Sequence, residues 1–371
     1  MPESLFYKII VKSGGAEYDL STDISSINWE QSDERPDRVT LQIPDPYKVF
    51  GHALREGTHV EFTFGTDAVH DIVFRGRIYS VAAKIAGSGL QALTVNAEDR
   101  SAELGLKKYP GRSYADELLS TIVKKILEPY KFADVHTKFG LDPKVTLVQQ
   151  DETDLAFLQR TAQNHGCTMF VSQTPDGEEI SFVGLAKLVA LEPKFVFSHG
   201  RFGVDSSLIE FQGQVDARRA QNRVILMGLE EKSEPIDPKA VDEPVDPFRD
   251  ENFAAFEDKI KLERLKILIN DASAAGEMTM LKAGEGGAQD EVIYVNVGSK
   301  DQLALLRENW ISVNAYGMTA DGTCAGLPGL RARATITLND VGGRFSGKWY
   351  VSQVVHSIGA EGFDTRFYCK R

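Results

Sequence analysis

The stretch from Gln150 to Phe170 reads QDETDLAFLQRTAQNHGCTMF and predicts a helix followed by a strand. Asp151 or Thr153 can cap the helix, because a short polar side chain there accepts a hydrogen bond from a free backbone N–H. Acidic side chains near the first turn favour the positive end of the helix dipole. The apolar residues that recur at helical spacing form one stripe, Leu155, Leu158 and Ala162. We therefore expect a helix over residues 152–165.

The end of this stretch indicates how the helix stops. Gly166 suits the left-handed residue that follows many helices, and residues 168–172 have the composition of a strand. Taken alone, the pattern is typical of a helix packed on a small sheet.

The stretch also contains a longer pattern, Q-x-E-x-D-x-x-F-L-x-R-x-A-x-x-x-G. This pattern resembles the signature of the phage late control protein D family, which are baseplate hub proteins of contractile tails. The fold of that family is similar to the amino-terminal hub part of the type VI secretion spike protein. The matching positions are Gln150, Glu152, Asp154, Phe157, Leu158, Arg160, Ala162 and Gly166.

Length and composition bound the class of protein. The chain has 371 residues, 42% of them hydrophobic and 26% charged, which is typical of an ordinary globular protein with two or more domains. Its formal net charge of −12 argues against a nucleic-acid-binding surface, because such surfaces are normally basic. An acidic wall would still let DNA slide past, since it repels phosphate, and we expect any channel wall to be neutral to acidic.

The three cysteines, Cys167, Cys324 and Cys369, have neither metal-ligand nor redox spacing, so we interpret them as reduced thiols of a cytosolic product. Residues 1–30 contain several acids and no long apolar run, so we expect no signal peptide. No apolar run approaches the ~20 residues of a membrane-spanning helix.

Residues 1–105 have the pattern of short strands in a first β-barrel. Apolar side chains alternate along residues 58–64 and 73–81, and Gly76 lies where a small barrel bends. The predicted inward side chains are Val60, Phe62, Phe64, Leu93, Val95 and Ala97. Arg75 and Arg77 alternate with the buried positions, which predicts a solvated or subunit-contacting face. Residues 60–65 and 73–78 also resemble the first barrel of tail hub proteins.

Residues 106–195 are predicted to form an α/β insertion. Ser113 can cap a helix over residues 113–131, with Asp116 and Glu117 in its first turn and Pro129 at its end. Its apolar stripe is Leu119, Ile122, Val123, Ile126 and Tyr130. The opening stretch follows, and residues 175–177, Pro-Asp-Gly, predict a turn between two strands.

The remaining residues are predicted to form a second β-barrel that is interrupted by an insertion. Residues 196–229 supply its first part, in which Ile209, Phe211 and Val215 alternate with polar residues, and residues 326–371 supply its closing strands. Between them, residues 230–325 hold an acidic Pro-rich loop (230–251) and a helical insertion. Helices are predicted from Phe253 to Ile267 and, after a capping box, from Ser299 to Trp310. The pattern over residues 327–367 resembles the closing strands of the late control protein D family.

No complete catalytic, cofactor-binding or metal-binding motif is present, so we predict no catalytic, cofactor or metal residues. The segment Gly342–Lys348 resembles a phosphate-binding loop, but Trp349 replaces the required Ser or Thr and a strand pattern follows, which favours a hairpin turn. Cys167 and His165 are too close in sequence for a nucleophile and its base, and His165 is a better helix cap. His356 lies mid-strand, which favours a packed or hydrogen-bonded ring.

The family resemblance implies an α+β fold with two small tail-tube-like β-barrels and inserted α/β and helical domains. It implies a structural hub of a contractile phage tail or related injection machine. Such a hub is a homotrimer whose ring adapts a sixfold tail tube to a threefold central spike around a channel. Its implied partners are the tail tube protein, the central spike protein and baseplate wedge or tape measure proteins, with no membrane and no specific nucleic-acid binding. Its implied location is the virion tail baseplate, after synthesis in the bacterial host cytoplasm.

Two other functions stay open at this point. The chain could be a tail-associated cell-wall hydrolase, because its many acids include pairs that could act as a glycosidase dyad. It could also be an adaptor that loads a secreted effector. Phage, bacteriocin and secretion-type machines are not separated by the sequence.

Overall fold

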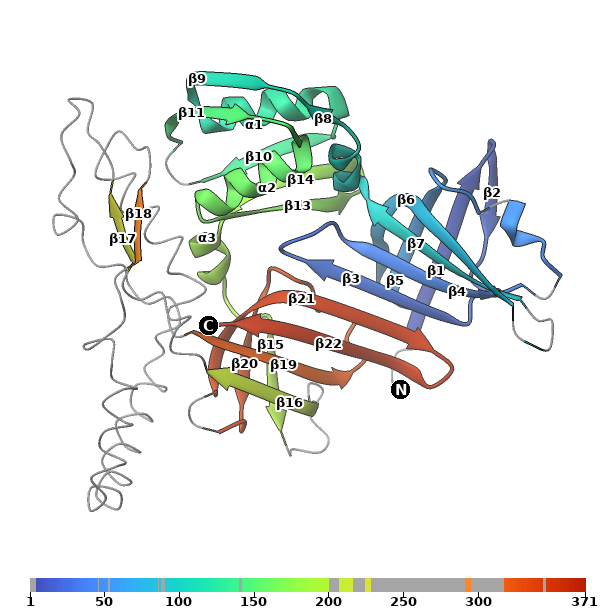
Figure 1. Ribbon diagram of the computed structural model, residues 1–371. Helices are drawn as coiled ribbons and strands as arrows, with labels where there is room; N and C mark the ends of the chain where they lie inside the picture. Colours follow the sequence, from blue (N-terminus) through green and yellow to red (C-terminus); the bar gives the residue numbers. More distant parts are fainter. Residues whose placement is uncertain are drawn as a thin grey trace, which may run out of the picture.

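The computed structural model describes residues 5–45, 47–52, 54–85, 87, 91–139, 142–199, 207–215, 224–227, 291–294, 317–342 and 345–371. Three parts can be followed in Figure 1: a first β unit, an inserted α/β unit, and a second β unit that holds the C-terminus. The fold is α+β with barrel-like β domains, as the sequence predicted. Within the described ranges, no helix has the length and apolar character needed to cross a membrane.

The first β unit is a curved sheet of seven strands in the order β2-β1-β5-β6-β7-β4-β3, antiparallel throughout. Gly76 is needed in β6, because a Cβ atom there would lie 2.1 Å from the carbonyl oxygen of Glu98 on the neighbouring strand. The elements are β1 (Leu5–Ser13), β2 (Ala16–Asp19), β3 (Ser26–Ser32), β4 (Arg38–Pro44), β5 (His59–Thr66), β6 (His70–Ile85) and β7 (Gln91–Asp99), with 3₁₀ helices η1 (Phe50–His52) and η2 (Arg100–Gly105).

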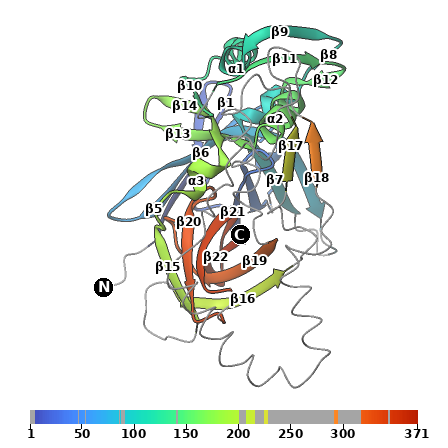
Figure 2. The same ribbon diagram turned by 90° about the vertical axis from the view of Figure 1, so that its left-hand side faces the viewer.

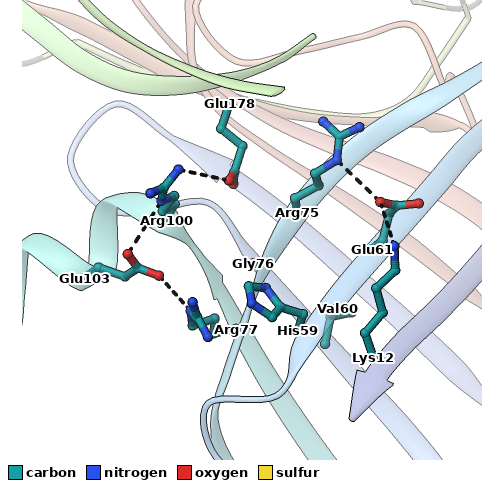
Figure 3. Close-up of a pocket in the computed structure, with 10 residues that line it drawn as sticks. All are labelled: Lys12, His59, Val60, Glu61, Arg75, Gly76, Arg77, Arg100, Glu103 and Glu178. Atoms are coloured by element: carbon teal, nitrogen blue, oxygen red, sulfur yellow. Dashed lines mark hydrogen bonds and ion pairs between the residues drawn. The ribbon is translucent and has the colours of Figure 1, made fainter. Parts of the chain in front are cut away.

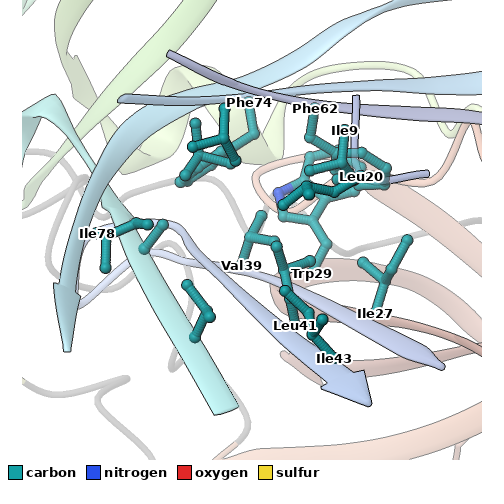
Figure 4. Packing of buried hydrophobic residues seen from close by; sticks show 14 of the residues in the cluster. Ile9, Leu20, Ile27, Trp29, Val39, Leu41, Ile43, Phe62, Phe74 and Ile78 are labelled. Atoms are coloured by element: carbon teal, nitrogen blue, oxygen red, sulfur yellow. The ribbon is translucent and has the colours of Figure 1, made fainter. Parts of the chain in front are cut away.

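The core of this unit lies on the concave face of the sheet (Figure 4). The side chains predicted to point inward are all buried, which confirms the period of two: Val60, Phe62, Phe64, Leu93, Val95 and Ala97. Trp29 lies among them and packs edge-to-face on two phenylalanine rings. The ring centroids are 5.8 Å apart for Phe62 and 5.9 Å apart for Phe64. Aromatic packing of this kind adds to the stabilisation from buried apolar area.

The second β unit is a closed ring of six strands. Each strand pairs with the next in the order β15-β16-β19-β22-β21-β20, and β20 pairs with β15 again. Figure 2 shows these strands curving around one core, which contains Phe197, Trp349 and Phe367. The strands are β15 (Phe195–His199), β16 (Ser207–Val215), β19 (Met318–Ala325), β20 (Thr335–Asn339), β21 (Gly347–Gly359) and β22 (Gly362–Lys370).

Two details of this unit differ from the sequence prediction. Strand β19 begins at Met318, inside the range 230–325 assigned to the loop and helical insertion, because it pairs with β16 and β22. The alternation predicted for Ile209 is wrong, because a register shift between Leu208 and Glu210 turns Ile209 outward. Leu208 is buried instead, and Ile209 is 60% exposed.

The α/β unit combines a three-stranded sheet in the order β10-β14-β13 with two short antiparallel ribbons, β11-β9 and β12-β8. Its helices cover the sheet and enclose a separate apolar core. Its elements are β8 (Lys108–Tyr109), β9 (Arg112–Leu118), α1 (Leu119–Leu127), η3 (Glu128–Tyr130), β10 (Asp134–Lys138), β11 (Lys144–Gln149), β12 (Glu152–Thr153), α2 (Asp154–Asn164), β13 (Cys167–Thr174), β14 (Gly177–Gly184) and α3 (Leu185–Val189).

The helix predicted over residues 113–131 is shorter than expected. Residues 113–118, including Ser113, Asp116 and Glu117, belong to β9 and pair with β11, so Ser113 is not a helix cap. The ladder satisfies the backbone groups that a cap would have served. Helix α1 keeps the predicted apolar stripe, since Leu119, Ile122, Val123 and Ile126 are buried.

Helix α2 is confirmed with Thr153 as its N-cap, whose hydroxyl accepts a hydrogen bond from the Ala156 N–H at 3.2 Å. Leu158 and Ala162 are buried as predicted, whereas Leu155 is only partly buried and Phe157 fills the core position beside it. Gly166 has a φ of +58°, the left-handed conformation expected after the helix. The turn at residues 175–177 joins β13 to β14, as predicted.

Part of the predicted insertion lies outside the described residues. This applies to the acidic Pro-rich segment 230–251 and to the helices predicted over 253–267 and 299–310. Two short strands next to it are described, β17 (Val224–Met227) and β18 (Glu291–Tyr294), and they pair in parallel. The domain boundaries across residues 228–316 therefore stay predictions.

Candidate functional site

A hydrogen-bonded joint connects the two β units. Strand β3 pairs antiparallel with the second half of β21, from Ser26 opposite Gly359 to Ser32 opposite Gln353. The first half of β21 pairs with β20 of its own unit, so this one strand serves both units. At the middle of the joint the rings of Trp29 and His356 stack with centroids 5.1 Å apart.

His356 is packed and hydrogen-bonded, as its mid-strand position predicted. Its Nδ1 lies 3.1 Å from the Thr365 hydroxyl and its Nε2 lies 3.0 Å from the Leu330 carbonyl oxygen. Burial and the nearby charge of Arg331 lower the pKa of His356 to about 3. The ring is therefore neutral at physiological pH, and both of its nitrogens have partners within the fold.

The two β units share the order and directions of five strands. The series β3-β4-β7-β6-β5 corresponds to β16-β19-β22-β21-β20, and all neighbours in both series are antiparallel. Each long strand has a one-residue register shift at the same place, at Tyr79 in β6 and at Ser352 in β21. These shifts align the units residue by residue, so that Ile78 corresponds to Val351.

The strands that follow these two series, β1 in the first unit and β15 in the second, do not correspond. Strand β1 is antiparallel to β5, whereas β15 is parallel to β20.

The alignment places Arg333 at the position of Gly57. The backbone N–H of Gly57 donates to the Ile78 carbonyl at 2.7 Å, and that of Arg333 donates to the Val351 carbonyl at 2.7 Å. Both residues have positive φ, +82° for Gly57 and +67° for Arg333. A side chain is strained in this region, so the contacts of the arginine must hold it there.

The Arg333 side chain reaches all three parts of the chain. Its Nη1 donates to the Ser32 carbonyl at 2.8 Å, and its Nη2 lies 3.3 Å from Asp37 Oδ2, both in the first β unit. The guanidinium lies over the Phe170 ring of the α/β unit, 4.6 Å from its centroid. Although burial alone would lower it, the pKa of Arg333 is raised by the charges of Asp37 and Asp33. Arg333 therefore contacts all three parts at the point where they meet.

Further carboxyl groups lie near Asp37, the ion-pair partner of this arginine. Burial raises the pKa of Asp33 to about 6, against the opposing effect of Arg333. Burial and the charge of Asp37 raise the pKa of Asp99 to about 7. Asp99 accepts hydrogen bonds from the Asp37 N–H and the Ser101 N–H, each at 2.8 Å. The cluster is thus an internal charge network at the joint.

A hollow of about 440 Å³ opens between the first β unit and the α/β unit (Figure 3). Its cations face acids: Arg75 lies 3.4 Å from Glu61, Arg77 lies 2.7 Å from Glu103, and Arg100 lies 3.8 Å from Glu178. Its lining residues are Lys12, His59, Val60, Glu61, Arg75, Gly76, Arg77, Arg100, Glu103 and Glu178. Of these pairs only Arg100 with Glu178 joins the two units, and the pairing leaves little positive charge for a ligand.

The outward face predicted for Arg75 and Arg77 is therefore in part a contact within the chain. Arg75 Nη1 donates to the Thr174 carbonyl of the α/β unit at 3.1 Å. Arg77 stays 46% exposed by its side chain and lies on the rim of the hollow.

The other residues considered for chemistry serve the fold. The Cys167 thiol donates to the His165 carbonyl at 3.3 Å, and His165 Nδ1 lies 2.8 Å from the Thr161 carbonyl, so the ring caps α2. Burial raises the pKa of the Cys167 thiol to about 12, which makes it a poor nucleophile. The segment 342–348 connects β20 to β21 as a hairpin, although residues 343–344 are not described. Among the described side chains, no group of acids, His and Cys has the arrangement of a metal site.

Solved structures with similar folds are tail proteins and secretion-system components. A prophage MuSo2 43 kDa tail protein from Shewanella oneidensis has 14% identity and a TM-score of 0.64, with 99% of this chain and 98% of that chain covered. A tail protein from Neisseria meningitidis has 15% identity and a TM-score of 0.62, with 98% and 96% covered. An E. coli component of the type VI secretion system has 13% identity and a TM-score of 0.53, with 94% and 73% covered. These likenesses establish a tail-protein-like fold.

Sequence comparisons add a family. No curated protein matches the chain. The family model described as the Alg8 N-terminal domain matches residues 50–243, which run from the first β unit through the α/β unit into the second β unit. The match covers a little over half of the chain and follows no boundary between the three parts. By this match, the chain belongs to the Alg8 N-terminal domain family.

Proposed function

We propose that this chain is a structural hub protein of a phage tail baseplate or related contractile injection machine, and that it catalyses no reaction. The observation that carries the proposal is the pair of β units with the same five-strand order, joined side by side within one chain. The tail-protein-like fold agrees with it.

The duplication suits a change of symmetry. Three copies of a chain with two similar β units present six such units, so a threefold ring would offer a near-sixfold face to a tail tube. The α/β unit and the insertion occur once per chain and would give a threefold face to a central spike. Baseplate wedge or tape measure proteins would bind at the periphery or along the channel. The place of action would be the virion tail baseplate, after synthesis in the bacterial cytoplasm.

The test is the number of copies in the intact particle. We expect three copies per tail or injection machine, measured by quantitative mass spectrometry against a tail component of known number. A count other than three would overturn the adapter role. Peptidoglycan zymography of the purified chain tests the absence of catalysis: hydrolysis that disappears on changing a single Asp or Glu would identify an enzyme instead.

A further inference from the structure

We propose that a second copy of this chain adds its strand β16 to the open edge of β6, in the register that β3 adopts on β21. This proposal rests on the hub function proposed above and deepens it, because it names the surface through which the copies join. Both edges come from described residues, and the chain itself contains the template for the joint.

The first edge belongs to β6. Strand β5 pairs with β6 only between His70 and Arg77, and beyond the register shift at Tyr79 the strand pairs with β7 alone among the described strands. The corresponding half of β21, Gln353–Gly359, has β3 on that side. An unpaired edge presents backbone N–H and C=O groups that another strand can use.

The second edge belongs to β16. Strand β15 pairs with β16 only at Ser207 and Leu208, so residues 210–215 pair with β19 alone among the described strands. The corresponding residues of β3 use the same side for β21. Each β unit therefore has two edges that can pair with another unit. Within the chain, β3 of the first unit pairs with β21 of the second, which leaves β6 of the first unit and β16 of the second open among the described strands.

The exposure of apolar residues distinguishes the used edge from the open one. Ile358 in β21 is 8% exposed, whereas Ile85, its counterpart in β6, is 58% exposed. Ala82 and Ala83 are exposed as well, while their counterparts Val355 and His356 are partly or fully buried. An apolar strand end left in water is a reason to expect a covering strand.

The alignment fixes which residues would face each other. The inward pairs of the internal joint are Ile27 with Ile358, Trp29 with His356 and Gln31 with Val354. Their counterparts between copies would be Phe211 with Ile85, Gly213 with Ala83 and Val215 with Val81. All six are apolar or glycine, so one face of the new joint can be buried, as the period of two requires.

The other face of the new joint would be mostly polar, with Gln212 opposite Lys84 and Gln214 opposite Ala82. The small central pair also suits its surroundings. The ring of Phe345 lies 2.7 Å from the place of a Cβ atom on Gly213, so it occupies the space that a side chain would need. A large residue fills the internal joint at Trp29, and Phe345 takes that role beside Gly213.

The joint is heterologous, because β6 of one copy meets β16 of the next. Such contacts close into a ring after a fixed number of copies or continue as a filament. The copy number is therefore a separate measurement from the joint itself.

The direct test is site-specific disulfide formation between two differently labelled chains. Chains with Gln212→Cys and chains with Lys84→Cys are purified separately, mixed and oxidised. Directly opposite residues bring their Cβ atoms within ~5 Å, so a covalent heterodimer should form, while neither chain alone should form a covalent homodimer. The native cysteines should interfere little, because all three are buried.

A matched control uses the neighbouring position. Chains with Ile85→Cys, mixed with the Gln212→Cys chains, place the thiols on opposite faces of the joint and should give at least about tenfold less heterodimer. Equal yields in the two mixtures, or homodimers of Lys84→Cys chains, would overturn the proposed register.

A second measurement avoids thiols. Ile85→Lys should weaken self-association by at least about tenfold, measured by sedimentation across a range of concentrations, without changing the melting temperature of the single chain. Val69→Lys is the control, since Val69 is 70% exposed in the turn between β5 and β6, away from both edges. Unchanged association of the Ile85→Lys chain would overturn the joint. Three copies per particle without the cross-link would support the hub function and overturn this joint. The cross-link together with another copy number would support the joint and overturn the hub function.

Discussion

The first and second β units use the same five-strand frame for different contacts. In the second unit the long strand β21 has neighbours along both halves, and its residue Ile358 is buried. In the first unit the matching strand β6 has β7 on one side, but on its other side only the first half is paired, with β5, and Ile85 is largely exposed. The two units share the backbone frame. Their side chains differ where the second unit has β3 as a partner within the chain and the first unit has no described strand.

The same contrast applies at the turn that precedes β5 in the first unit and β20 in the second. Gly57 adopts its left-handed backbone without strain, whereas Arg333 adopts it because Asp37, Ser32 and Phe170 hold its side chain. The arginine is thus a specific addition to the shared frame. It converts a simple turn into the point at which the three parts of the chain meet.

Arg333→Ala is expected to give the largest effect, because it leaves the buried Asp37 side chain without its ion-pair partner. Breaking a buried ion pair by removing one partner typically costs about 3–5 kcal/mol. Alanine is strained by the positive φ of this position as arginine is, so the change measures the contribution of the Arg333 side chain alone. Chemical denaturation would measure the loss in the free energy of unfolding.

Arg366→Ala is the matched control. Arg366 pairs with Asp321 at 3.0 Å on the surface of the second β unit, and its side chain is 52% exposed. Removing an exposed pair costs about 0–1 kcal/mol. Similar losses for the two variants would contradict the special role of Arg333.

The pH dependence of stability sharpens the comparison, because the acids lie in the first unit. Matching backbone hydrogen bonds show which residues replace these acids in the second unit. The Asp99 N–H donates to the Asp37 carbonyl, and the Arg371 N–H donates to the Met318 carbonyl, so Arg371 and Met318 take the positions of Asp99 and Asp37.

In the folded chain the pKa of Asp33 is raised to about 6 and that of Asp99 to about 7, from an ordinary value of 3.8. In these two carboxyls the folded state holds more protons than the unfolded state, so they lower the free energy of unfolding as pH rises from about 4 to 7. His356 acts in the opposite sense over part of this range, because burial lowers its pKa in the folded state to about 3.

Asp33→Asn should make the slope of the free energy of unfolding against pH more positive, because asparagine stays neutral at every pH and the contribution of Asp33 is lost. Denaturation midpoints at several pH values would measure the slope. Asp176→Asn, in the exposed turn between β13 and β14, serves as the control and should leave the slope unchanged. Equal slopes for the wild-type and Asp33→Asn chains between pH 4 and 7 would contradict the assignment of Asp33.

The sequence predicts those parts of the fold whose pattern is local. Alternation placed Val60, Phe62 and Phe64 in the core, and the cap, stripe and glycine predicted α2. The prediction was wrong at residues 113–118, where cap-like residues lie in a strand that pairs with β11, about thirty residues away. It was also wrong at Ile209, because a bulge changes the phase of the alternation and has no signal in composition.

The joint could not be predicted in the same way. Arg333, Asp33 and Asp99 come from distant parts of the sequence, and their residue types are common on protein surfaces. Only the fold buries Arg333 and Asp99 and partly buries Asp33. The family resemblance predicted two similar barrels, but their residue-by-residue match could not be predicted, because matching positions hold unlike residues such as Trp29 and Gly213. Only the backbone pairing and the two matching register shifts reveal it.

Gly57→Ala is expected to give the smallest effect and tests the alignment itself. A Cβ atom at Gly57 would meet no heavy atom within 4 Å, so the cost comes only from its φ of +82° and should be about 1 kcal/mol. Gly51→Ala is the control, because Gly51 also has open surroundings but lacks positive φ, and its change should stay within about 0.5 kcal/mol. If Gly57→Ala cost nothing, the left-handed turn would relax freely in the first unit. The strain at Arg333 would then not need its buried partners, and the difference between the two units would reduce to the open and filled edges of β6 and β21.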